Sequence, residues 1–186
     1  CNLIKVLRTR RWMMLIYLED IIQFTLGKNT TRINPQTTDI YTPDDFEKDL
    51  HSINRLDKPE ECIINLIKSK AAPLSKETQE KCITSNFLRC SFDTSILDPW
   101  YFCYQFNAGK EIENQIYRFH QGNTLSVKKL NVQTIGKLQI PVLDIKRQQQ
   151  IGNIYKKAII QKDLMLQQAE NMETMALTII RKIEED

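Results

Sequence analysis

The sequence has few of the residues that build common catalytic centres. Its 186 residues include only five glycines, which are scattered along the chain. A phosphate-binding P-loop and the cofactor loop of a methyltransferase both need clustered glycines, because their backbone must approach the ligand closely. The Asn-Pro-Pro-aromatic motif of amino-methylating enzymes is also missing. The sequence therefore excludes a P-loop, argues against a methyltransferase and predicts no cofactor.

Five cysteines and two histidines do not form a metal-binding pattern. No C-x-x-C pair occurs, although such pairs mark most zinc sites and redox motifs. Cys62 and Cys103 lie inside apolar runs. We therefore expect no metal, buried free thiols and a reducing, cytoplasmic environment. No apolar run approaches the length of a membrane span, so no membrane partner is expected.

Acidic residues suggest a nuclease only superficially. Asp44 and the run Asp144-Ile145-Lys146 match parts of a metal-dependent nuclease motif, but they lie about a hundred residues apart. Both acids also suit the start of a helix. His51 and His120 have no evident nucleophile as a partner. We expect no catalytic residues, which leaves binding as the function class.

The feature that the sequence does have is a long uninterrupted C-terminal stretch, residues 144–186, with no proline and one glycine, Gly152. Apolar residues recur there in alternating steps of four and three, which is typical of a coiled coil. This seam comprises Ile151, Tyr155, Ala158, Met165, Ala169, Met172, Ala176, Ile179 and Ile183, interrupted by Lys162. A helix of this length runs roughly 60 Å, so we expect it to pair with another helix. A terminal helix packed along its own domain is the alternative.

The residues before this helix predict an α+β domain without regular βαβ order. Residues 15–24 are expected to begin as a strand and then to turn into a helix. Further strands are expected over 39–41, 62–67, 82–84, 86–92 and 140–142. Helices are expected after two pairs of an N-cap and a proline, Thr42-Pro43 and Asp98-Pro99, and over 111–119. We divide the chain into an N-terminal leader (1–14), a domain (15–143) and the helix (144–186). Because the chain begins with Cys1, we expect either a piece of something longer or initiation at Met13 or Met14.

Three polar, basic segments of the domain are candidates for contact with DNA, although each also suits a plain solvated surface. Lysine and arginine bind phosphates, and Arg, Lys, Asn and Gln recognise base edges. The net charge of +3 is compatible with this role but does not establish it. The candidates are Lys28, Asn29, Thr30 and Arg32 in the first basic loop, Lys68, Ser69 and Lys70 in the second basic loop, and Arg118, His120, Gln121, Asn123, Thr124 and Lys128 in the third basic segment.

Several motifs in a fixed order carry a resemblance to a known family. They are Asp98-Pro99-Trp100-Tyr101-Phe102, Gln121-Gly122-Asn123-Thr124-Leu125-Ser126, Leu138-Gln139-Ile140-Pro141, and Gln148 with Ile151 at the head of the long helix. With these motifs the chain resembles the specificity (S) subunit of Type I restriction–modification systems. Leu18-Glu19-Asp20-Ile21-Ile22 before Gly27-Lys28 is similar to the opening of that family's target recognition domain. The likeness covers nearly everything after residue 14.

The resemblance implies a target recognition domain of α+β fold followed by a conserved coiled-coil helix. A full S subunit usually has two such domains, which each recognise half of a split DNA sequence, and two antiparallel helices that set the gap. It is non-catalytic. Its implied partners are double-stranded DNA, methyltransferase (M) subunits docked on the helices and, through them, the restriction (R) subunit.

This chain has one domain and one helix, so we expect either a half-length S subunit or a fragment of a longer one. A half-length subunit would pair with a second copy of itself, as a homodimer on an inverted-repeat target. Two other functions stay open. One is a coiled-coil adaptor with a protein-binding head, and the other is a recognition module detached from a single-chain restriction–methylation enzyme.

Overall fold

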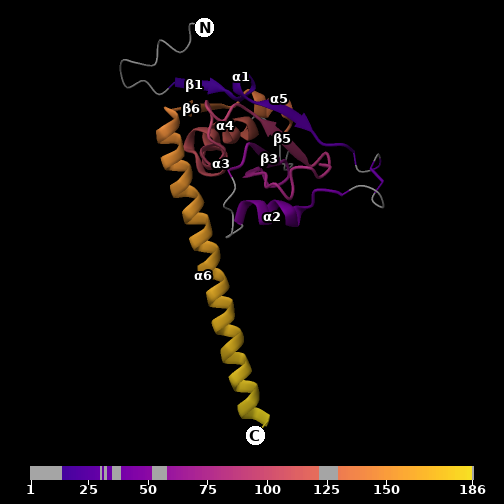
Figure 1. The fold of residues 1–186 in the computed structure, drawn as a ribbon, viewed down its shortest axis with the longest axis vertical. Helices are drawn as coiled ribbons and strands as arrows, with labels where there is room; N and C mark the ends of the chain where they lie inside the picture. Colours follow the sequence, from indigo (N-terminus) through magenta and orange to yellow (C-terminus); the bar gives the residue numbers. More distant parts are fainter. Residues whose placement is uncertain are drawn as a thin grey trace.

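The structure, a computed structural model, describes residues 14–29, 31, 33–34, 39–51, 58–121 and 130–185, except for the side chains of residues 120 and 121. Its strands are β1 (Met14–Tyr17), β2 (Gln23–Leu26), β3 (Glu61–Asn65), β4 (Lys70–Pro73), β5 (Phe87–Ser91) and β6 (Gln139–Val142). Its helices are α1 (Leu18–Ile21), α2 (Pro43–His51), α3 (Pro99–Ala108), α4 (Lys110–Gln121), α5 (Val132–Gly136) and α6 (Ile145–Glu185). The predicted α+β class with one long C-terminal helix is confirmed: a mixed head carries a helix that extends away from it (Figure 1).

Two antiparallel sheets organise the head. β1 pairs with β6, and the other strands form a four-stranded sheet in the order β2-β5-β3-β4. The β1–β6 ribbon brings the first described strand beside the last one, and Leu18 N donates to Leu138 O just beyond it. Because β6 immediately precedes α6, this ribbon lies where the long helix begins (Figure 1).

Helix α3 is the central packing element of the head. It is apolar on nearly all faces, and Trp100, Tyr101, Phe102 and Phe106 are all buried. A helix of this kind must be covered on every side. The structure meets this requirement by packing α3 between strand β4, helix α4 and the first part of α6.

The two helix starts predicted from N-cap and proline pairs are confirmed. At the start of α2, Thr42 Oγ1 accepts from Asp45 N at 3.1 Å and Asp45 Oδ2 accepts from Thr42 N at 2.9 Å. This reciprocal pair is a capping box, which satisfies two of the N–H groups that a helix start leaves open. At the start of α3, Asp98 Oδ1 accepts from Tyr101 N at 2.9 Å, with Pro99 in the first position.

Some predicted strands are shorter than expected. Residues 39–41 and 82–84 form only single bridges, Ile40 with Cys82 and Thr84 with Lys28. The strand predicted over 62–67 ends at Asn65, because Asn65 Oδ1 accepts from the N–H groups of Ile67 and Lys68, both at 3.0 Å. These side-chain bonds turn the backbone out of the sheet. β2, β4 and α5 are additional elements that the sequence pattern did not predict, and β4 begins at Lys70, which was expected to lie in the second basic loop.

None of the described helices is both long and apolar enough to cross a membrane. The four described cysteines are free thiols, as predicted, with Cys62, Cys90 and Cys103 buried and Cys82 partly exposed. Burial raises the pKa of the Cys62 thiol and that of the Cys90 thiol well above the ordinary value of a cysteine.

The Asp45 carboxyl links the start of α2 to Lys81. Lys81 Nζ lies 3.1 Å from Asp45 Oδ1 and 3.2 Å from Oδ2. Burial alone would raise the pKa of Asp45, but the hydrogen bonds from Thr42 and Lys81 outweigh it and hold this pKa below its ordinary value. A carboxyl with a lowered folded-state pKa contributes stability above its unfolded pKa, and this contribution is lost as the pH falls through the folded pKa.

We expect Asp45→Asn to lower the free energy of unfolding by about 1 kcal/mol at pH 7. The difference from wild type should narrow as the pH falls below about 4, because the wild-type carboxyl then takes up its proton too. Urea titrations from pH 7 to pH 3 measure both effects. Asp44→Asn, at an exposed position in the same first turn, is the matched control. If the free energy of unfolding of Asp45→Asn stays below that of wild type by the same amount down to pH 3, the result contradicts this role of Asp45.

Candidate nucleic-acid interface

The first and second basic loops leave the four-stranded sheet at the same end. β2 and β3 run in the same direction, because each is antiparallel to the β5 strand between them. At this end Gly27 N donates to Phe87 O and Leu66 N donates to Asn86 O. Two strands with one strand between them lie roughly 10 Å apart, so the bases of the two loops are close neighbours.

The base of the first basic loop is fixed by the backbone. Lys28 N donates to Ile83 O at 2.9 Å, and Ser85 N donates to Lys28 O at 2.8 Å. Gly27 makes this approach possible, because a Cβ at this position would lie 2.1 Å from Thr84 O. The side chain of Lys28 is exposed. The loop therefore presents a cation from a rigid base.

The second basic loop is a tight turn whose cations have partners within the chain. Ser69 has a φ of 51°, in the left-handed region. Lys68 Nζ forms an ion pair with Glu47, and Lys70 Nζ donates to Asn107 O at 2.7 Å. Both lysine side chains are exposed. Exposed pairs of this kind contribute little stability, so a phosphate can compete for either ammonium group.

The first two turns of α4 lie beside the second basic loop. Ser69 and Lys70 of this loop and Glu113 and Tyr117 of α4 line one hollow of about 370 Å³. Tyr117 is 63% exposed. Arg118, the next residue of α4, is also exposed and forms no ion pair within the described part of the chain. The structure thus brings the second basic loop next to the start of the third basic segment.

The remaining predicted DNA-binding residues cannot be placed in this way. Asn29 is exposed, and its Oδ1 accepts from Thr31 N at 3.3 Å. The residues that lie outside the described ranges are Thr30, Arg32, Asn123, Thr124 and Lys128, together with the side chains of His120 and Gln121.

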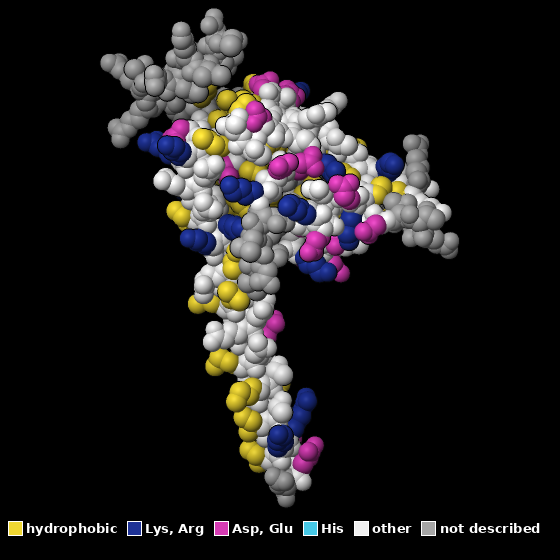
Figure 2. All heavy atoms as spheres, viewed as in Figure 1, with side chains coloured by type: hydrophobic (Ala, Val, Ile, Leu, Met, Phe, Trp, Pro, Cys, Tyr) yellow, Lys and Arg dark blue, Asp and Glu magenta, His cyan; other side chains and the backbone are white. Residues whose placement is uncertain are grey.

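Charges of both signs are interspersed over the head in the view of Figure 2. Acidic residues also accompany the basic loops, as Glu47 does at Lys68 and Glu113 does in the hollow. This pattern agrees with the small net charge of +3. Phosphate contact at this end of the sheet would therefore depend on individual cations rather than on a large positive field. Within the described ranges, no group of three or more His, Cys, Asp and Glu residues could hold a metal ion.

The base of α6 is fixed to the head by a buried glutamine. Gln148 is fully buried, and its Oε1 accepts from Asp98 N at 3.0 Å. Its Nε2 donates to Ile96 O at 2.9 Å and to Leu143 O at 2.8 Å. These three bonds connect α6 to the segment that leads into α3 and to the segment that leads out of β6. The sequence singled out Gln148 only as part of a family motif, and only the structure shows its contacts.

One turn further along, Gly152 lets α6 touch the start of α3. A Cβ at Gly152 would lie 2.6 Å from Asp98 Oδ1 and 2.8 Å from Tyr101 N, distances that real Cβ atoms do not show. Burial raises the pKa of this Asp98 carboxyl, although the N–H groups of Tyr101 and Trp100 act in the opposite direction. The single glycine of α6 is therefore a point of close helix contact rather than a break in the helix.

Tyr155 completes this contact at the other end of α3. Its hydroxyl oxygen accepts from Asn107 Nδ2 at 3.0 Å, and its ring meets Trp100 and Tyr104 edge-on. Ile151 packs against the head as well. The start of the predicted dimer seam is therefore covered by the chain itself: Tyr155 contacts α3, and Ile151 packs against the core of the head. An apolar periodicity cannot distinguish an internal partner from an external one.

The second half of α6 lies beyond the head, and every residue from Leu164 to Glu185 is exposed. Large apolar side chains stay uncovered there, with Met172 66% and Ile183 71% exposed. Figure 2 shows apolar side chains along one side of this part of the helix. We define the distal stripe from the heptad spacing of the sequence as Met165, Ala169, Met172, Ala176, Ile179 and Ile183, the part of the predicted seam beyond Lys162. The alternative of a helix packed wholly on its own domain holds for its first half only.

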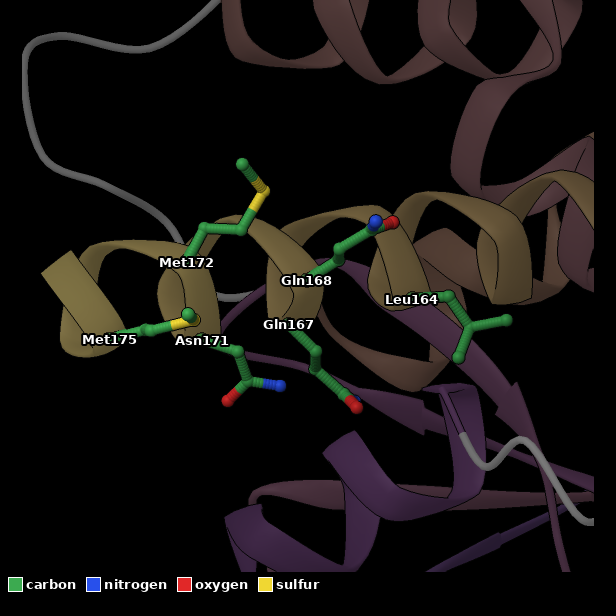
Figure 3. Close-up of a pocket in the computed structure, with 6 residues that line it drawn as sticks. All are labelled: Leu164, Gln167, Gln168, Asn171, Met172 and Met175. Carbon is green, nitrogen blue, oxygen red and sulfur yellow. The ribbon is translucent and has the colours of Figure 1, made fainter.

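A hollow on the flank of the distal stripe is formed by α6 alone. Six side chains line it, among them Leu164, Met172 and Met175 with Gln167, Gln168 and Asn171. Figure 3 shows Met172 and Gln168 pointing to one side of the helix and Met175 and Asn171 to another. Because all of these residues belong to one helix, the hollow has no opposite wall. It suits another helix better than an enclosed small molecule.

Two solved structures have a similar fold. One is the HsdS subunit from Thermoanaerobacter tengcongensis, with a TM-score of 0.52 and 16% sequence identity over 84% of this chain and 39% of that chain. The other belongs to a type I R-M system studied for complex assembly and conformational transition, with a TM-score of 0.56 and 15% identity over 90% of this chain and 43% of that chain. The chain thus spans about two fifths of the length of these proteins. No protein-family model and no curated protein matches the sequence.

We expect Gln148→Leu to lower the free energy of unfolding by at least about 3 kcal/mol. Leucine fills a similar volume but removes the hydrogen-bond partner of Asp98 N and of two carbonyl groups at a buried position. Urea denaturation followed by circular dichroism measures the loss. Gln149→Leu, at the exposed neighbouring position, is the matched control. Our assignment is wrong if the Gln148 variant stays within about 0.5 kcal/mol of wild type, the range of ordinary surface substitutions.

Proposed function

We propose that this chain is a DNA-sequence-recognition subunit of a Type I restriction–modification system, with one target recognition domain (15–143) and one spacer helix (144–186). The observation that carries the proposal is a head fixed to a helix whose distal half is exposed and packs against none of the described residues of the head. Two basic loops leave one end of the sheet of this head. The fold shared with an HsdS subunit supports the proposal.

In this proposal the chain does no chemistry itself. Its role is to place methyltransferase and restriction subunits at a DNA sequence that it recognises. The other similar structure is named for the assembly of a type I R-M system, which supports partners of this class. A reducing cytoplasm, which we propose as the compartment, fits the free thiols of the described cysteines.

DNA contact is proposed for the end of the sheet where the two basic loops emerge. Lys28 and Arg118 are exposed cations without an ion-pair partner among the described residues. Lys70 Nζ donates to the backbone carbonyl of Asn107, and a phosphate can replace this acceptor. Such cations contribute affinity through phosphates, and neighbouring polar side chains contribute selectivity through base edges. We extend the proposed contact to Tyr117, because it shares a hollow with Lys70.

A second copy of the chain is the partner that we propose for the distal stripe. The stripe is apolar and exposed from Met165 to Ile183, a length of roughly 28 Å. Residues 145–162 of the helix carry five basic and no acidic side chains, whereas residues 163–185 carry five acidic side chains and two basic ones, Arg181 and Lys182. An antiparallel pair places opposite charges side by side, whereas a parallel pair places like charges together. The antiparallel dimer also sets the two heads at opposite ends of the rod.

A non-enzymatic adaptor with a protein-binding head is the second candidate function. Its support is the mixed charge of the head, where acidic residues accompany the basic loops. The two candidates differ in duplex binding, because only the recognition subunit requires it.

We expect a mixed-sequence duplex to bind the full chain with an affinity that falls steeply as salt rises. Lys28→Ala and Arg118→Ala should each weaken binding and reduce the slope of log K against log salt by about 1, because each removes one phosphate contact. Fluorescence anisotropy over a series of salt concentrations measures both quantities. Lys76→Ala is the matched control, since Lys76 follows Leu74 at the opposite end of the sheet. Absence of duplex binding at every salt concentration would favour the adaptor.

We expect Met172→Glu to weaken dimerisation at least about 100-fold, because a symmetric interface would bury this charge twice without a partner. Sedimentation equilibrium measures the dissociation constant. Thr174→Glu is the control: it lies about 200° further round the helix, opposite the distal stripe. Equal effects of the two substitutions, or a wild-type chain that is monomeric at all concentrations, would count against pairing through this stripe.

A further inference from the structure

We propose that Gly152, Gln148 and Tyr155 are positioning residues that fix the direction of α6, and thereby the distance between the two DNA half-sites that a dimer recognises. This inference rests on the proposed function, because it requires two heads held apart by paired helices. It adds a determinant of half-site spacing that is independent of the length of the helix.

The first support is that α6 holds α3 at both ends. Gln148 Oε1 accepts from Asp98 N, at the start of α3. Tyr155 Oη accepts from Asn107 Nδ2, in the last turn of α3. Two attachments at the two ends of one helix determine a direction, whereas one attachment would allow α6 to pivot. We define the α6 shoulder as these contacts together with Gly152.

The second support is that the separation between the helices at the shoulder is set by a missing side chain. At Gly152 a Cβ would lie 2.8 Å from Tyr101 N and 2.9 Å from Trp100 Cβ. These atoms belong to the first turn of α3, which is capped by Asp98 and buried in the core. They cannot move aside as the far end of a flexible side chain can. An added methyl group must therefore displace α6 itself.

The third support is the length of unsupported helix beyond the shoulder. No residue after Asp163 is covered by the described part of the head. A shift of about 1 Å at Gly152, with contacts one to two turns further on as the pivot, tilts the helix by about 5 to 10°. Such a tilt moves the end of α6 by about 4 to 8 Å, which is at least the rise of one base pair, about 3.4 Å. A small change at the shoulder therefore becomes a change of one or more base pairs in the spacing between half-sites.

The test is selection from a duplex library with random sequence, using the full chain, followed by sequencing of the bound DNA. The wild type should enrich an inverted repeat with one preferred spacing. Gly152→Ala should enrich the same half-sites with a spacing that is shifted or broadened by at least one base pair. Gly136→Ala is the matched control: the three atoms nearest to its added Cβ all belong to the Glu19 side chain, which is exposed and can move. It should keep the wild-type spacing.

A purely structural role for Gly152 would weaken binding at every spacing and leave the preferred spacing unchanged. Identical spacing in Gly152→Ala and wild type therefore overturns the inference and leaves the proposed function intact. A wild-type chain that enriches no paired motif overturns both.

If Gly152→Ala does not fold, the same selection experiment with Tyr155→Phe tests the inference. This variant keeps the ring against Trp100 and Tyr104 but removes the bond to Asn107. We expect it to broaden the spacing with unchanged half-sites. A spacing as sharp as that of the wild type would refute the role of the shoulder.

Discussion

The contact between α3 and α6 is the constraint on which the rest of this structure depends. α3 is apolar on nearly every face, so it must be enclosed, and the first half of α6 supplies one wall. The contact is close because Gly152 has no side chain, and it is directional because Gln148 bonds to the chain on both sides of the junction. Core packing and the orientation of the long helix thus have the same physical origin.

The head and the helix have different requirements. The head buries its own apolar residues in one core and presents polar loops at one end of its sheet. The distal half of α6 leaves large apolar side chains in water, among them Met172 and Ile183, at a cost of about 25 cal/mol for each Å² of apolar surface. The head together with the first half of α6 therefore encloses a core of its own, whereas the distal half of α6 requires a partner to cover its apolar side chains. This division suits a subunit that recognises DNA with one part and assembles with the other.

Local rules predicted most of the elements correctly. Thr42 and Asp98 both cap helices, and the apolar periodicity after Asp144 marks one long helix. The sequence was insufficient to predict the surroundings of a residue wherever they depend on contacts with residues far away along the chain. Ile151 and Tyr155 fit a coiled-coil seam but pack against the head of their own chain, and nothing in the sequence indicated that Gly152 is a point of close contact with α3. The ion pair of Lys68 with Glu47 could not be predicted either, because it joins two elements through the tertiary fold.

The central claim is that the head and the base of α6 form one rigid body that pairs with a second copy through the distal stripe. Small-angle X-ray scattering from the full chain in solution tests this claim most directly. An antiparallel pair predicts a distance distribution with two maxima, the second of them, from the separation of the heads, on the order of 50 to 60 Å. A single compact maximum, with the mass of one chain at all concentrations, would contradict it.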